Sequence, residues 1–351
     1  MACGEAADGF SLLLCLLRPA AAEDVVVEFS HLHSRRTHER LDGAIDRAWE
    51  AALAVNARLF DGSKFRLASI SREATGEPLL RLGLTGYREY LGTNRLDAAG
   101  LAELIADGRR YHGHADAYLS NALGCEAVLI TSDDHAVLLR RSTAVATHGG
   151  LYNGPSGHPE PERAGLACPS FAEGLEGRTN GSTPCSALAK AEPGSENARA
   201  CDELFDSIVQ ETVEETGIRR SHLSSPLLIG LMADACHKPD ALFVLFTTLT
   251  TSQVRRTYES GTAEEGWESD ALTLVHIDAL LAHAASDESA SHGGLRVDNW
   301  SGKMACIQLT AVTRAAIECM RRIRHHAMER TRDSDPVAPM SLAWLEELRR
   351  R

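Results

Sequence analysis

The sequence lacks the features that mark several common protein classes. Its 351 residues contain no apolar run near the ~18 residues that a membrane-spanning helix needs. Its 36 Lys and Arg residues are outnumbered by 49 Asp and Glu. The net charge of −13 disfavours broad binding to nucleic acid or to anionic membranes, which require a basic surface. Aromatic content is low at 5%, but the apolar content of 44% is ordinary for a globular protein.

Paired cysteine motifs are also absent. The nine cysteines are scattered and odd in number, without a C-x-x-C pair, so neither a disulfide framework nor a zinc site is indicated. A reducing compartment is expected, the cytoplasm first and the nucleus as a second location. The Leu-rich segment 10–17 follows Glu5 and Asp8 and no basic residue, which favours a buried first strand over a signal peptide.

The hydrophobic pattern predicts a mixed α/β protein. Strands are expected at 11–17, 25–29, 65–71, 79–85, 127–131, 136–141, 226–231, 241–249 and 272–277. Helices are expected at 42–57, 97–107, 115–119, about 201–216, 304–324 and 341–350. These elements suggest an N-terminal α+β region (10–122), a second domain (123–325) and a peripheral tail (326–351). Residues 162–200 are rich in Gly, Ala, Ser and Pro without periodicity, and predict a mobile insertion.

Residues 210–218, Gln-Glu-Thr-Val-Glu-Glu-Thr-Gly-Ile, form the most informative segment. On a helix, Glu211, Glu214 and Glu215 share one face and repel one another. A divalent cation would remove that repulsion, and oxygen ligands suit Mg²⁺ or Mn²⁺ better than zinc. Gly217 is placed to end the helix. The alternative is a solvated acidic helix end.

This segment resembles the signature of Nudix hydrolases, of which it keeps E-x-x-E-E-x-G-Ile. It departs at Gln210, where the family usually has Arg, and at Thr212. Gly157, within residues 154–160, resembles the family's glycine loop, separated from the helix by the insertion. The resemblance implies a Nudix-type α/β/α sandwich with a mixed sheet, in which Glu211, Glu214 and Glu215 bind the metal and take part in catalysis.

A narrower resemblance links the chain to the Nudix type 22 proteins, through the segments 59–67, 80–94, 157–161, 203–211 and 251–258. It implies Mg²⁺-dependent hydrolysis of UDP-glucose and UDP-galactose to UMP and the sugar 1-phosphate. Another nucleoside diphosphate derivative, such as ADP-ribose, is an alternative substrate. A Nudix-fold nucleotide-binding protein without activity is a second alternative, against which the three retained helix acids speak.

Position and resemblance together suggest further site residues. Phe60 and Tyr87 would stack on uracil, and Arg141 would contact a phosphate. Glu268, preferred to Glu264 and Glu265, would be an additional catalytic carboxylate before the strand 272–277. The remaining substrate-binding candidates are Ala146, Asn153 (where the family has an acid), His158, Glu160 and Ser301, the last at the expected N-terminus of the closing helix.

Overall fold

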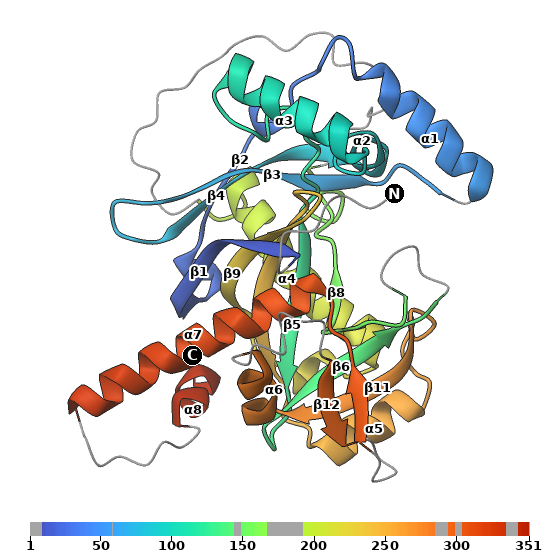
Figure 1. Ribbon diagram of the computed structural model, residues 1–351. Coiled ribbons are helices and arrows are strands. Elements are labelled where there is room, and N and C mark those ends of the chain that lie inside the picture. The colour runs from blue at the N-terminus through green and yellow to red at the C-terminus, as the bar shows by residue number, and fades with distance from the viewer. Residues whose placement is uncertain are drawn as a thin grey trace.

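The computed structural model describes residues 9–57, 59–143, 149–166, 192–284, 294–298, 304–334 and 343–350 (Figure 1). Ala146 and Ser301 lie outside these ranges, as does most of the predicted insertion. No helix in the described part of the chain is long and apolar enough to cross a membrane.

An eight-stranded mixed sheet forms the centre of the larger part of the molecule. Its main path runs β1 (Phe10–Ala20), β9 (Leu227–Asp234), β10 (Pro239–Phe246), β5 (Gly124–Ile130), β6 (His135–Arg141) and β11 (Ser269–His276). Two short strands extend it, β7 (Tyr152–Asn153) beside β6 and β8 (Ser156–Gly157) beside β5. β10 and β5 are parallel, whereas β9 pairs antiparallel with both β1 and β10, so the sheet is mixed as expected.

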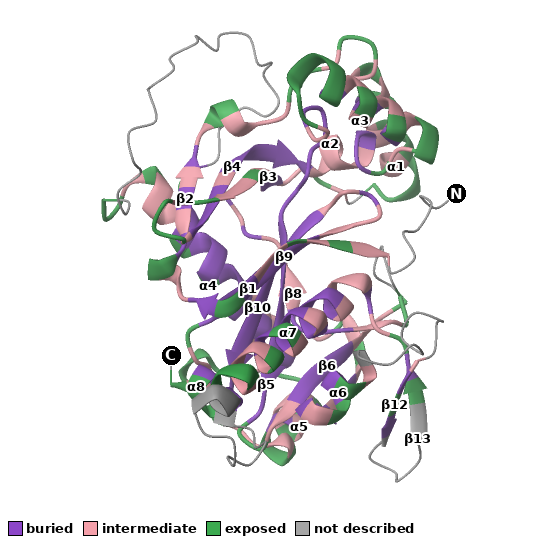
Figure 2. Ribbon diagram, turned by 60° about the vertical axis from the view of Figure 1, so that its left-hand side comes forward, coloured by how far each residue is buried: buried purple, intermediate pink, exposed green. Residues whose placement is uncertain are grey.

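Helices cover both faces of this sheet, because the side chains of its central strands alternate between two apolar clusters. On one face, α4 (Glu196–Thr216) packs Leu204 and Ile208 against Ala127 and Phe243. The other face packs against α6 (Ile277–Ala284), α7 (Ala311–Ser334) and α8 (Ala343–Arg349). Figure 2 shows the buried residues concentrated on the central strands. The arrangement confirms the predicted α/β/α sandwich.

The N-terminal region adds a smaller sheet of three strands, β2 (Val26–Phe29), β4 (Pro78–Gly86) and β3 (Ser63–Arg72), in that order. It carries α1 (Gly43–Val55), α2 (Tyr87–Gly92) and α3 (Ala98–His112), which lie together at one end of the molecule (Figure 1). β1 is not part of this sheet. It pairs along its length with β9 of the main sheet, although it comes first in the chain.

Several sequence-based expectations were wrong in detail. Residues 115–118 form a turn instead of a helix, and the buried Arg66 guanidinium donates hydrogen bonds to the carbonyl oxygens of Asp116 and Leu119, the latter at 3.0 Å. Met304–Ile307 is strand β13, paired with β12 (Leu295–Asp298), so the closing helix begins only at Ala311. Ser301 therefore precedes a strand, and the predicted helix N-terminus for a phosphate is not at that position.

The predicted insertion and the predicted tail also differ from expectation. α4 begins at Glu196, with Ser195 as its N-cap, so the last residues of the predicted insertion are helical. In the C-terminal tail, α7 continues to Ser334. Trp344, Leu345 and Leu348 of α8 are buried in the apolar cluster under α7. The tail thus contributes to the core because its apolar residues, spaced for one helical face, have a sheet-side surface to cover.

Candidate active site

The glycine loop lies directly on the acidic helix. β8 pairs with β5 so that Gly157 is opposite Cys125, and the missing side chain of Gly157 faces α4. A methyl group at this position would collide with the carboxylate of Glu211. Glycine therefore lets the loop approach the helix this closely without displacing the Glu211 carboxylate.

Three backbone amides of this loop donate hydrogen bonds to carboxylates of α4. Ser156 N lies 3.2 Å from Glu215 Oε2, and Glu160 N lies 3.0 Å from Glu203 Oε1. The amide of His158 donates to Glu211. These bonds hold the loop against the helix, although a long stretch of chain separates them in sequence.

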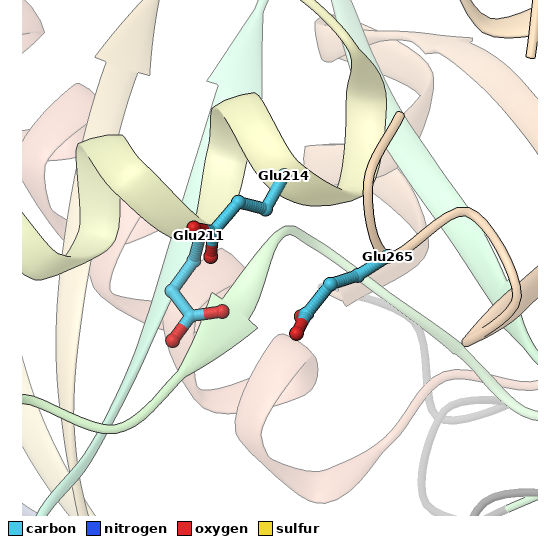
Figure 3. Close-up of side chains that lie close together, drawn as sticks. All are labelled: Glu211, Glu214 and Glu265. Atoms are coloured by element: carbon cyan, nitrogen blue, oxygen red, sulfur yellow. The ribbon is translucent and has the colours of Figure 1, made fainter. Parts of the chain in front are cut away.

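Three carboxylates converge beside this contact (Figure 3). One oxygen each of Glu211, Glu214 and Glu265 lies within 4.8 Å of the others. Glu265 comes from the segment before β11, where its backbone N donates to Glu214 O at 3.0 Å. Oxygen atoms at this spacing suit a hard divalent cation. We call Glu211, Glu214 and Glu265 the acidic group.

Burial and mutual repulsion govern the protonation of these carboxylates. Burial, followed by the charges of Glu265 and Glu214, raises the pKa of Glu211 to about 8. Burial also raises the pKa of Glu265. Without a cation, Glu211 therefore retains its proton near neutral pH, and a bound divalent cation would replace it. The residues present fit a metal site.

Glu215 and Glu268, both predicted as catalytic, lie next to the acidic group. Glu215 is only 4% exposed, and burial, with the charges of Glu211 and Glu268, raises its pKa well above the ordinary value. Burial also raises the pKa of Glu268, while the positive charge of Arg141 lowers it. The sequence favours Glu268 over Glu265 as a site residue, whereas the structure places Glu265 in the acidic group. Sequence order does not show which of the two side chains points towards α4.

Gln210 occupies the position where the family usually has Arg. Its Nε2 donates to Glu214 Oε1 at 2.6 Å, and the Arg163 guanidinium lies 4.0 Å from the same oxygen. Gln210 thus orients one carboxylate of the acidic group without a charge of its own.

The predicted phosphate contacts gather around the glycine loop. Arg141 ends β6, and its charge influences Glu215, Glu268 and His158. Burial, together with the charges of Lys238, Lys64 and Arg141, holds the pKa of His158 well below its usual value. His158 is therefore neutral at physiological pH.

The other predicted substrate residues have defined neighbours. Asn153 is 4% exposed, and its Nδ2 donates to Ser156 Oγ at 2.8 Å. The Glu160 carboxylate pairs with Lys64 at 3.1 Å and with Arg163 at 3.3 Å.

The two predicted stacking residues lie in the N-terminal region. Phe60 is 76% exposed, which leaves its ring available to a ligand. Tyr87 is half-buried, with ring contacts to Trp49 at 6.4 Å and Tyr90 at 6.1 Å between centroids. Among the described residues, the rings of Phe60 and Tyr87 make no contact with each other.

One buried acid near the loop was missed. Glu126 on β5 is 1% exposed, and its Oε1 accepts from Gly154 N at 3.3 Å. Its Oε2 has no hydrogen-bond donor among the described residues, and burial raises its pKa to about 8. The signal in the sequence was a single Glu inside the otherwise apolar run 124–130.

This chain is similar in sequence to several known proteins. The "Uridine diphosphate glucose pyrophosphatase NUDT22" of Bos taurus is 38% identical over 275 residues, covering 77% of this chain and 87% of that protein. The protein of the same name from Homo sapiens is 38% identical over 270 residues, covering 75% and 82%. "Nudix hydrolase 9" of Arabidopsis thaliana is 33% identical over 295 residues, covering 81% and 88%. The chain belongs to the Nudix hydrolases.

Other comparisons add less. No family profile matches this Nudix hydrolase. Among solved structures, the MutT protein from Methanosarcina mazei Go1 matches with a TM-score of 0.28 at 13% identity, over 59% of this chain and 94% of that one. Nudix hydrolases generally use a divalent metal, in agreement with the acidic group.

Proposed function

We propose that this Nudix hydrolase cleaves the diphosphate of UDP-glucose, and of UDP-galactose, to give UMP and the sugar 1-phosphate. The observation that supports it is the acidic group, whose three carboxylate oxygens lie within 4.8 Å of one another against a glycine loop. The relatives named uridine diphosphate glucose pyrophosphatase, up to 38% identical, support the choice of substrate.

Mg²⁺ is the proposed cofactor, with Mn²⁺ as a substitute, since oxygen ligands alone suit these ions. Glu211, Glu214 and Glu265 would hold it, with Glu215 directly beside them. When bound, such an ion neutralises phosphate charge and lowers the pKa of a coordinated water.

The protein's own residues divide the remaining work. Water attacks one phosphorus, the bond from that phosphorus to the bridging oxygen breaks, and the water's proton must leave. Glu268 is the proposed proton acceptor, because Arg141 counteracts the effect of burial on its pKa and favours its ionised form. Arg141 would also bind a non-bridging phosphate oxygen. His158, which is neutral, would contribute a hydrogen bond without adding charge.

Recognition of the nucleotide and sugar is assigned to residues outside the acidic helix. Phe60 and Tyr87 would stack on the uracil ring. Asn153 and Glu160 would contact the sugar or diphosphate, as would Ala146 and Ser301, which the structure does not describe. The six described thiols are free, in keeping with a proposed location in the reducing cytoplasm or nucleus.

A substrate panel tests this proposal. Turnover is measured for UDP-glucose, UDP-galactose, ADP-ribose and GDP-mannose, with Mg²⁺ and with chelator. We expect Mg²⁺-dependent release of UMP, with kcat/KM for UDP-sugars more than about tenfold above the purine nucleotides, because a pocket sized for a pyrimidine excludes a purine. Equal kcat/KM for ADP-ribose would refute the uridine assignment, and no turnover of any member would indicate a binding protein.

A further inference from the structure

Lys238 lies in the turn between β9 and β10. Its Nζ lies 2.6 Å from Asp240 Oδ1, and both side chains are largely buried. A methyl group at Gly124 of β5 would collide with this ammonium nitrogen and with the Asp240 carboxylate. Gly124 therefore provides the space in which the ion pair lies.

The strand register places this ammonium group beside the glycine loop. Gly124 is opposite Asp240 on β10, and its neighbour Cys125 is opposite Gly157 on β8. Because β5 and β8 run antiparallel, the residue before Cys125, Gly124, lies opposite the residue after Gly157, His158. The influence of Lys238 on His158 follows from this placement, since its charge helps to lower the pKa of that imidazole.

The turn that carries Lys238 is held firmly. Asp234 Oδ1 accepts the backbone amides of Cys236 at 2.8 Å and Lys238 at 2.9 Å. From the N-terminal region, the buried Asn94 donates from Nδ2 to Cys236 O at 2.9 Å. This bond helps to fix the turn and so preorganises the lysine.

The charges of three cations from separate elements act together to lower the pKa of His158: Lys64 of β3, Arg141 of β6 and Lys238. On the other side of the loop, Gly157 touches Glu211 of the acidic group. A chain with a net charge of −13 needs such local positive charge to admit an anionic substrate.

We propose that Lys238 is a substrate-binding residue, whose ammonium group, held by Asp240, donates hydrogen bonds to the phosphate that lies away from the acidic group. The inference rests on the proposed function, because it assigns Lys238 to a diphosphate substrate. An ammonium group has three donors, so the bond to Asp240 leaves two for phosphate oxygens. Holding the side chain in place lowers the entropic cost of binding.

The test uses the full chain and inorganic pyrophosphate, titrated calorimetrically with Mg²⁺, together with kinetics on UDP-glucose. Lys238→Met should weaken pyrophosphate binding at least about tenfold, as expected for loss of a charge-assisted hydrogen bond. It should raise KM for UDP-glucose similarly and leave kcat within about threefold, because the contact is made in ground and transition states alike. Lys238→Arg should keep the affinity within about threefold, since the charge remains.

Two further variants separate binding from structure. Asp240→Asn keeps a side-chain oxygen that can accept a hydrogen bond from the ammonium group and removes a negative charge, so it should bind pyrophosphate at least as well as wild type. Arg220→Met removes one charge from the exposed Arg220–Asp206 pair and should match wild type. If Asp240→Asn weakens binding as much as Lys238→Met, binding depends on the intact ion pair and not on the charge of Lys238, and the inference is wrong.

The remaining outcomes also decide. Should Lys238→Met fail to fold, Lys238→Met combined with Asp240→Asn leaves no buried charge unpaired and must show the same loss of affinity. Wild type that binds pyrophosphate through Lys238 but turns over no UDP-sugar would refute the proposed function and keep this inference. Wild type without affinity for pyrophosphate, or Lys238→Met equal to Arg220→Met, would overturn it.

Discussion

Replacing Glu211 with Gln should have opposite effects on activity and on the stability of the metal-free protein. In the folded state, burial and the neighbouring charges raise the pKa of Glu211 from 4.5 to about 8. The folded state therefore binds more protons than the unfolded state between these values. The stability that this carboxyl contributes is present below about pH 4.5 and is lost as the pH rises through about 8.

The magnitude follows from the same pKa. Each unit is worth about 1.36 kcal/mol, which sets an upper limit of about 4 to 5 kcal/mol. Part of the carboxyl contacts solvent, which screens its charge, so we expect about 1 to 3 kcal/mol. Glutamine cannot ionise and avoids this loss. Glu211→Gln in chelator should therefore be more stable than wild type at pH 8.5, with little difference at pH 4.5.

The activity of Glu211→Gln should fall at least about a hundredfold with Mg²⁺, because a metal ligand is lost. Thermal unfolding in chelator and in Mg²⁺ across this pH range, with steady-state turnover, measures both effects. Asp202→Asn, on the exposed face of α4, is the control and should match wild type. More than about half of wild-type turnover, or a stability difference independent of pH, would refute the assignment of Glu211.

Three further predictions concern other parts of the site. Glu265→Gln should raise the Mg²⁺ concentration for half-maximal activity at least about tenfold, because a metal ligand is lost. Glu268→Gln should lower kcat and leave that concentration unchanged. The reverse pattern in Mg²⁺ titrations would make Glu268 the metal ligand and Glu265 the proton acceptor. Gly157→Ala should lower kcat/KM at least about tenfold and reduce the melting temperature, because its methyl group would displace Glu211. Unchanged values would contradict the close approach of the glycine loop to α4. Tyr87→Ala should raise KM for UDP-glucose more than it lowers kcat, and a pure kcat effect in initial-rate kinetics would exclude stacking.

The acidic helix could be predicted from sequence because its geometry is local. Residues three and four apart must share a helix face, so Glu211, Glu214 and Glu215 follow from spacing alone. The left-handed Gly217 at the helix end and the alternation of the buried strands are local in the same sense. With the resemblance to Nudix hydrolases, these patterns were sufficient for the fold class and the general site.

Only the tertiary structure decided which distant residues join that helix. Glu265 enters the acidic group because its backbone amide bonds to Glu214 of α4, and Lys238 lies against Gly124 because the strand register places Asp240 there. β1 pairs with β9, and α8 packs into the core, because burial of apolar surface stabilises contacts between segments that are far apart in the sequence. Local spacing determines what one helix presents, but the packing of the whole chain determines what faces it.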